Sequence, residues 1–93
     1  MAQLKKILLV DDEKKFLNSI AERLRLMGHD PIKASSGRKA LALARESGFD
    51  LAIVDLKMPG MNGLEVCRAV RRNDQLTKMK VLITTGHPHH PDL

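Results

Sequence analysis

Two short apolar runs that each end in aspartate place the tightest limits on the fold of this chain. Residues 7–10 are continuously apolar and precede Asp11 and Asp12, and residues 51–54 are continuously apolar and precede Asp55. A short apolar run of this kind is typical of a strand whose two faces are both covered. The two runs therefore predict two buried strands, each of which carries carboxylates at its carboxyl end.

Segments with helical periodicity separate the apolar runs. Phe16, Ile20, Leu24 and Met27 recur at intervals of three or four residues, and Gly28 follows them as a stop signal. This pattern predicts a first helix with these four side chains along its apolar face.

Two further helices show the same kind of pattern. Ser35 or Ser36 can cap a helix that runs to about residue 46, and Gly48 is expected to end it. Another helix is expected to follow the Pro/Gly loop at residues 58–63 and to end near Arg72. The apolar residues that mark these helices are Ala40, Leu41 and Ala44 in the first, and Leu64, Cys67 and Val70 in the second.

Two more strands complete an alternating order. Residues 29–34 predict a short strand, which Pro31 places near a sheet edge because proline cannot donate a ladder hydrogen bond. Residues 81–83 predict the fourth strand. The resulting β-α-β-α-β-α-β order predicts an α/β fold with a parallel sheet, right-handed crossovers and helices on both faces. Ligands of such sheets bind beyond the carboxyl ends of the strands.

Length and composition exclude several classes of protein. The chain has 93 residues, which allows one domain, and its longest apolar run is far shorter than the roughly 20 residues of a membrane span. Cys67, the single cysteine, cannot form an internal disulfide, which fits a reducing cytoplasm. The net charge is +5, but the lysines and arginines are scattered along the chain. The sequence also contains no Tyr or Trp on which bases could stack, so no surface for direct nucleic-acid binding is expected.

Three carboxylates fall at the carboxyl ends of two predicted strands, namely Asp11, Asp12 and Asp55. If these strands are neighbours, the acids converge, and close like charges need a compensating cation or proton. Each aspartate alone could equally form a turn, and Asp12 could cap the first helix. Together they favour a site for a hard divalent cation such as Mg2+.

Three motifs together resemble the receiver domain of two-component response regulators. They are residues 7–13 (ILLVDDE), residues 55–63 (DLKMPGMNG) and residues 85–87 (TGH). In order and at this spacing they cover essentially the whole chain. The resemblance implies a flavodoxin-like, doubly wound parallel sheet in the order 2-1-3-4.

The resemblance also implies a role for each site residue. Asp55 would accept the phosphoryl group from a histidine kinase or a histidine phosphotransfer protein. Asp11, Asp12, Asp55 and the backbone carbonyl of Lys57 would bind Mg2+. Thr85 would be the switch residue, although from composition alone Thr84 has an equal claim and only one of the pair can face the pocket. Pro59 and Gly63 would shape the loop beside the metal. Such self-catalysed transfer is not turnover of a free substrate, so the chain is not expected to be an enzyme.

The match stops after the fourth strand. A receiver ordinarily continues into a fourth helix, a fifth strand with a phosphoryl-binding lysine, and a closing helix, but no lysine follows Thr85. We therefore expect residues 1–93 to form a C-terminally incomplete receiver with slower or uncoupled phosphorylation. The fourth strand would then be an exposed edge, which predicts marginal stability or self-association through that edge.

The sequence also allows functions other than that of a phosphoacceptor. The first is a phosphorylation-independent interaction module of the same fold. A small phosphatase with an aspartyl nucleophile would place a second aspartate where Lys57 stands, and a nucleotide binder would need a glycine-rich phosphate loop that is absent. The histidines at positions 87, 89 and 90 could chelate a metal, but Pro88 and Pro91 favour an extended tail.

Overall fold

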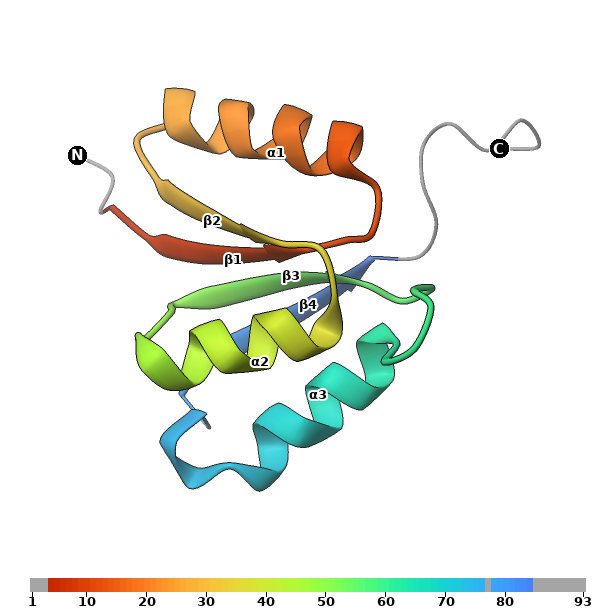
Figure 1. Cartoon of the computed structure of the whole chain (residues 1–93). Helices are drawn as coiled ribbons and strands as arrows, with labels where there is room; N and C mark the ends of the chain where they lie inside the picture. The colour runs from red at the N-terminus through yellow and green to blue at the C-terminus, as the bar shows by residue number, and fades with distance from the viewer. Residues whose placement is uncertain (1–3, 77, 85–93) are drawn as a thin grey trace.

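The computed structural model describes residues 4–76 and 78–84, and in these ranges strands and helices alternate along the chain (Figure 1). The tail histidines lie outside these residues. The elements are β1 (Lys6–Val10), α1 (Lys14–Leu26), β2 (Asp30–Ala34), α2 (Gly37–Glu46), β3 (Leu51–Asp55), α3 (Gly63–Arg72), the 3-10 helix η1 (Asp74–Leu76) and β4 (Lys80–Thr84). All the strands and helices predicted from the described part of the sequence are present.

The described strands form one parallel sheet in the order β2-β1-β3-β4. The register pairs Leu8 of β1 with Ile32 on one side and with Ala52 on the other. The predicted flavodoxin-like order 2-1-3-4 is therefore confirmed, and Pro31 lies in an edge strand as expected. The two apolar runs that end in aspartate are the central neighbours β1 and β3.

Helices cover both faces of this sheet (Figure 1). Alternate residues of β1 point to opposite faces, so Ile7 and Leu9 pack beneath α1 while Leu8 and Val10 pack beneath α2 and α3. All four side chains are buried, and burial of each contributes about 1.5–3 kcal/mol to stability. The unbroken apolar run at residues 7–10 is thus explained by burial on two faces.

Helix capping decides between the two candidate serines. The backbone N–H of Lys39 donates to Ser36 Oγ at 3.2 Å, so Ser36 caps α2. Asn62 caps α3 in a reciprocal arrangement with Glu65, through bonds of 3.0 and 3.1 Å. α2 ends at Glu46, as expected, with Ser47 as its C-cap and Gly48 directly after the cap.

The apolar face of α1 differs in phase from the sequence prediction. Leu17 and Ala21 are its buried residues, whereas Met27 is 65% exposed. Met27 is the C-cap, after which the chain turns through Gly28 at a φ of +91°. The prediction was therefore wrong for Met27, because its side chain lies beyond the last helical turn.

The apolar face of α3 is also centred differently from the prediction. Val66 and Val70 are buried, while Leu64 is 47% exposed. Residues four apart share a helix face, whereas residues two apart lie about 200° apart around the axis. Leu64 consequently points away from the face that Val66 and Val70 bury.

A short segment before β4 adds core residues that periodicity did not reveal. Leu76 in η1 and Met79 after it are both buried against the side of the sheet that α2 and α3 cover. Neither belongs to a helix or strand long enough to show a repeat. Within the described parts of the chain, no helix is long and apolar enough to cross a membrane.

Candidate functional site

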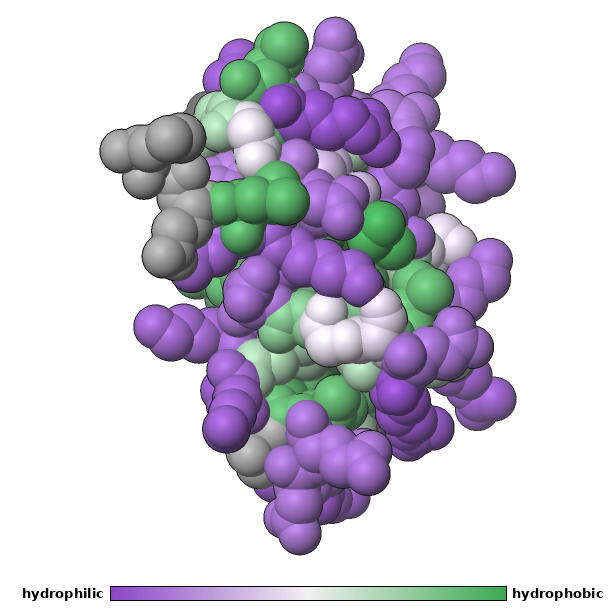
Figure 2. Space-filling view, turned by 90° about the vertical axis from the view of Figure 1, so that its left-hand side faces the viewer, coloured by the Kyte–Doolittle hydropathy of each residue, from purple (hydrophilic) through white to green (hydrophobic). Residues whose placement is uncertain are grey.

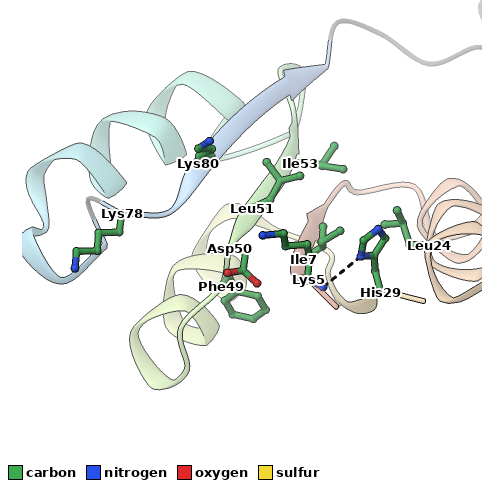
Figure 3. Close-up of a pocket in the computed structure, with 10 residues that line it drawn as sticks. All are labelled: Lys5, Ile7, Leu24, His29, Phe49, Asp50, Leu51, Ile53, Lys78 and Lys80. Atoms are coloured by element: carbon green, nitrogen blue, oxygen red, sulfur yellow. Dashed lines mark hydrogen bonds between the residues drawn. The ribbon is translucent and has the colours of Figure 1, made fainter. Parts of the chain in front are cut away.

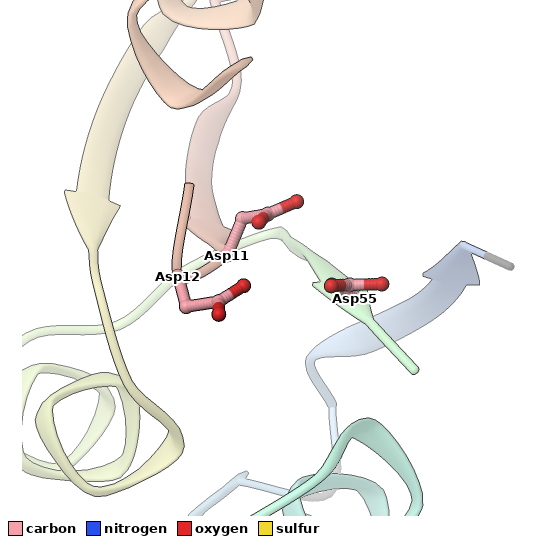
Figure 4. A group of neighbouring side chains, drawn as sticks. All are labelled: Asp11, Asp12 and Asp55. Carbon is pink, nitrogen blue, oxygen red and sulfur yellow. The ribbon is translucent and has the colours of Figure 1, made fainter. Parts of the chain in front are cut away.

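Three carboxylates gather at the carboxyl edge of the sheet (Figure 4). Asp11 and Asp12 follow β1, and Asp55 ends β3, which is its parallel neighbour. One carboxylate oxygen from each residue can be chosen such that all three lie within 4.8 Å of one another. Asp11 and Asp55 are buried, at 3% and 2% exposure, whereas Asp12 is exposed to solvent.

Short-range hydrogen bonds orient the two buried carboxylates. Oδ1 of Asp11 accepts from the backbone N–H of Glu13 at 2.9 Å, and Oδ1 of Asp55 accepts from the backbone N–H of Lys57 at 3.3 Å. Both bonds span two residues, which is the local turn that aspartate favours. The backbone N–H of Asp11 also donates to the carbonyl of Ala34 at 3.2 Å, which ties the site to β2.

The chemistry of the three residues fits a hard divalent cation. Each offers a carboxylate oxygen, and oxygen ligands are those that Mg2+ and Ca2+ take in proteins. Three negative groups this close repel one another, and two of them are buried where water screens the repulsion less. A cation at this position would relieve that repulsion, and the exposure of Asp12 leaves one side of the site open to solvent.

Gly63 brings the following loop close to the acidic site. A Cβ at this position would lie 2.6 Å from the carbonyl oxygen of Asp55 and 2.9 Å from Cα of Leu56. The backbone N–H of Gly63 donates to the Leu56 carbonyl at 3.2 Å. Only glycine allows this approach, because any side chain would displace the backbone that carries Asp55. Pro59 in the same loop is exposed, and Gly60 has a φ of +75°.

Gly37 is a second close approach, which the sequence interpretation missed. A Cβ there would lie 2.8 Å from Cγ2 of Val66 and 3.0 Å from Cβ of Met61. The glycine therefore lets the first turn of α2 pack against the loop and helix that follow Asp55. In the sequence, Gly37 stands directly after the Ser36 cap, which is the one feature that could have drawn attention to it. A glycine at the start of a helix does not by itself indicate close packing, however, because it is equally compatible with an exposed helix start.

The last described strand brings Thr84 to this region. Thr84 pairs in register with Asp55, its hydroxyl donates to the Val54 carbonyl at 3.5 Å, and it lines a small hollow together with Asp11. Thr85, the switch residue that the resemblance indicated, lies outside the described residues.

Comparison with known families gives a match over residues 7–93 to the response regulator receiver domain. The chain belongs to this family. Among curated relatives, it is 31% identical over 87 residues to the protein PilH of Pseudomonas aeruginosa, which covers 94% of this chain and 72% of PilH. It is 40% identical over 70 residues to the transcriptional regulatory protein AfsQ1 of Streptomyces coelicolor, covering 75% of this chain but only 31% of AfsQ1.

A solved structure supports the assignment at the level of the fold. The response regulator TrrA of Thermotoga maritima, crystallised in complex with Mg(2+)-BeF, superposes with a TM-score of 0.82 at 32% identity. The superposition covers 96% of this chain and 76% of TrrA. Receiver domains are signalling modules rather than catalytic enzymes, and they interact with histidine kinases. The acidic site of this chain is therefore the acidic pocket of a receiver domain.

Proposed function

We propose that this receiver domain accepts a phosphoryl group onto Asp55 from the phosphohistidine of a histidine kinase or a histidine phosphotransfer protein. The observation that carries the proposal is the convergence of Asp11, Asp12 and Asp55 within 4.8 Å at the carboxyl edge of the sheet. Asp55 ends the central strand β3, and its backbone packs against Gly63.

The transfer would be an in-line displacement at phosphorus. A carboxylate oxygen of Asp55 forms the new O–P bond while the P–N bond to the donor histidine breaks. The electron pair of the broken bond stays on the imidazole nitrogen, which is then protonated by solvent. The product is an acyl phosphate on Asp55 and a free histidine on the donor.

The proposed Mg2+ ligands are the carboxylates of Asp11, Asp12 and Asp55 together with the backbone carbonyl of Lys57. When bound, the cation would offset the negative charge of the phosphoryl oxygens. Asp11 is held by the N–H of Glu13, so it enters the site already oriented. Asp12 is the exposed member and would bind at the open side of the site. The likeness to TrrA, which was crystallised with Mg2+, supports this assignment.

The remaining site residues would connect the phosphoryl group to the fold. We assign the switch role to Thr85, whose hydroxyl would bond a phosphoryl oxygen. Pro59 and Gly63 would shape the loop beside the metal, and the close approach of Gly63 to Asp55 supports this role for the glycine.

The biological setting follows from the same proposal. Residues 1–93 would act as one receiver unit in the cytoplasm, with a kinase or phosphotransfer protein as phosphodonor and without direct contact to nucleic acid. Leu82 of β4 is 54% exposed, which supports self-association at the fourth-strand edge.

Intact mass measurement after incubation with Mg2+ and acetyl phosphate tests the proposal. We expect a gain of one phosphoryl group that is lost in Asp55→Ala and kept in Asp30→Ala. Asp30 is a matched control because it is an exposed aspartate at the opposite end of the sheet. Circular dichroism of each variant shows whether the fold is retained.

The interaction-module alternative predicts a different result. A folded protein that gains no phosphoryl group from acetyl phosphate, nor from a phosphorylated histidine phosphotransfer protein, would refute the phosphoacceptor role. An adduct that persists in Asp55→Ala would show that another residue is modified, and it would also contradict the assignment.

A further inference from the structure

A hollow lies where α1, β2 and α2 meet, at the end of the sheet where β2 leads into α2. Its volume is about 230 Å3, and it is built entirely from residues 14–39. The lining residues are Lys14, Leu17 and Asn18 of α1, Lys33 of β2, Ser35 after β2, and Lys39 of α2. Pockets for drug-sized ligands are larger, at about 300–1,000 Å3, so this hollow has room only for a compact ligand.

Three separate elements direct lysine side chains to this hollow. Lys14 and Asn18 are four residues apart in α1, so they share one face of that helix. Nζ of Lys33 in β2 donates a hydrogen bond to Oδ1 of Asn18 at 2.7 Å. Nζ of Lys39 in α2 donates to Oγ of Ser35 at 3.4 Å. Both acceptors line the hollow, so these bonds hold two ammonium groups at its wall.

The positive charge of this lysine cluster is not compensated within the described part of the chain. None of Lys14, Lys33 and Lys39 forms an ion pair with a carboxylate there. The two acceptors described above are a neutral amide and a neutral hydroxyl, and no acidic residue lines the hollow. Glu46 lines an adjoining hollow together with Lys33 and Lys39, but it pairs with neither. An anion between the three lysines would relieve their mutual repulsion.

Two helix N-termini add positive potential at the same place. Lys14 is the first residue of α1, and Lys39 lies in the first turn of α2. A helix N-terminus carries a partial positive charge, which acidic groups stabilise and lysines do not. Neither first turn contains an acidic residue. An anion in the hollow would therefore interact favourably with both helix ends as well as with the three ammonium groups.

We propose that this hollow binds a short phosphate chain, as in pyrophosphate, tripolyphosphate or the phosphate tail of a nucleotide. The anionic oxygens would accept hydrogen bonds from the ammonium groups of Lys14, Lys33 and Lys39. Lysine binds phosphate as a point charge, and such charge-assisted hydrogen bonds are stronger than neutral ones. Three lysines on three elements suit a ligand with several anionic oxygens. The site is separate from the acidic pocket, since none of the three aspartates of that pocket lines the hollow.

The lining also determines which part of such a ligand is recognised. No arginine lines the hollow, so the bidentate fork that suits a carboxylate of a protein partner is absent. No aromatic ring lines it either, so the base of a nucleotide would gain no stacking energy there. We therefore expect the phosphate chain itself to be recognised, without a contribution from an attached nucleoside.

Isothermal titration calorimetry with tripolyphosphate measures this binding, at about 0.1 M salt and with EDTA present. EDTA removes Mg2+, so binding through a metal at the acidic pocket does not contribute, and the result is independent of phosphorylation at Asp55. We expect one tripolyphosphate to bind per chain, and ATP to bind no more tightly than tripolyphosphate. Lys33→Gln/Lys39→Gln removes two of the three ammonium groups and is expected to weaken binding at least ~10-fold.

Two lysines at the other end of the sheet provide a matched control. Lys78 and Lys80 line a different hollow, at the edge where the strands begin (Figure 3). Figure 2 shows this edge of the molecule, where hydrophilic side chains surround separate apolar groups. Lys80 of β4 and Lys33 of β2 are three strand spacings apart, or about 14 Å, which exceeds the Debye length of ~10 Å at 0.1 M salt. Lys78→Gln/Lys80→Gln removes the same charge and is expected to weaken binding less than ~3-fold.

Other outcomes of the same titrations would overturn the proposal. Equal losses in both double variants, or binding of many tripolyphosphate molecules without saturation, would show general charge attraction only. Tighter binding of ATP than of tripolyphosphate would show that the nucleoside is recognised, and tighter binding of a hexaglutamate peptide would assign the hollow to an acidic protein segment. All four substituted lysines are exposed, so both double variants are expected to remain folded, which circular dichroism verifies.

Discussion

Gly63 lies so close to Asp55 that a Cβ on the glycine would stand 2.6 Å from the aspartate carbonyl oxygen. This contact joins the start of α3 to the end of β3. It therefore ties the backbone of the proposed phosphoacceptor to the helix that follows it, and it explains why the loop after Asp55 needs glycine at this position.

Gly63→Ala is expected to destabilise the fold by about 2 kcal/mol or more, since the neighbouring atoms are backbone and cannot rotate away. Thermal unfolding measures the effect, and for a domain of this size each kcal/mol corresponds to about 4–8 °C. Gly48→Ala is the matched control, because no atom lies within 4 Å of a Cβ there. An equal loss of stability in both variants would contradict the close-approach argument.

Mg2+ is expected to raise the melting temperature of the protein, and part of this effect should depend on Asp12 as a ligand. At a concentration 100 times the dissociation constant, binding to the folded state adds about 2.7 kcal/mol. Asp12→Asn removes one proposed ligand and one of three close negative charges. We therefore expect Asn at this position to reduce the Mg2+ effect while leaving the metal-free stability equal or higher. An unchanged Mg2+ effect in Asp12→Asn would refute this ligand.

The capping of α2 gives a comparison between neighbouring serines. Ser36→Ala removes the acceptor for the Lys39 N–H and is expected to cost about 1 kcal/mol of unfolding free energy. Ser35→Ala is expected to cost less than ~0.5 kcal/mol, because Ser35 Oγ accepts only an exposed lysine ammonium at 3.4 Å. Urea unfolding at constant m-value measures both, and the reverse ranking would contradict the assigned cap.

The corrected face of α3 gives a second comparison. Val66→Ala is expected to cost about 2 kcal/mol, since its side chain is 2% exposed and would leave a cavity. Leu64→Ala removes a larger side chain that is 47% exposed, and it is expected to cost less than about 1 kcal/mol. Denaturant unfolding measures the free energy of unfolding of both variants. Equal losses of stability would show that Leu64 also lies on the buried face of the helix, and would contradict this assignment.

Self-association through β4 is expected to respond to a lysine on the edge. Within the described residues, β4 pairs with β3 and no strand borders its other side. Leu82→Lys places a charge on this strand, which disfavours edge-to-edge pairing. Sedimentation velocity is expected to show a concentration-dependent dimer that weakens in Leu82→Lys. A parent protein that remains monomeric at high concentration would contradict the prediction.

The sequence by itself determined the α-helices and strands, their succession along the chain and the three acids of the site. The apolar runs at residues 7–10 and 51–54 could be interpreted locally, because a strand buried on both faces needs an apolar residue at every position. Asp11, Asp12 and Asp55 could be singled out because they end those runs. The resemblance to receivers then supplied the order of the strands, which the residues alone left open.

Only the tertiary structure decided how closely the elements approach and which residues face inward. The choice of Ser36 over Ser35, the exposure of Leu64 and the tight contacts at Gly37 and Gly63 depend on atoms far away in the sequence. A pattern of apolar residues shows which side chains need burial, but the position of the packed layers determines which of them obtain it.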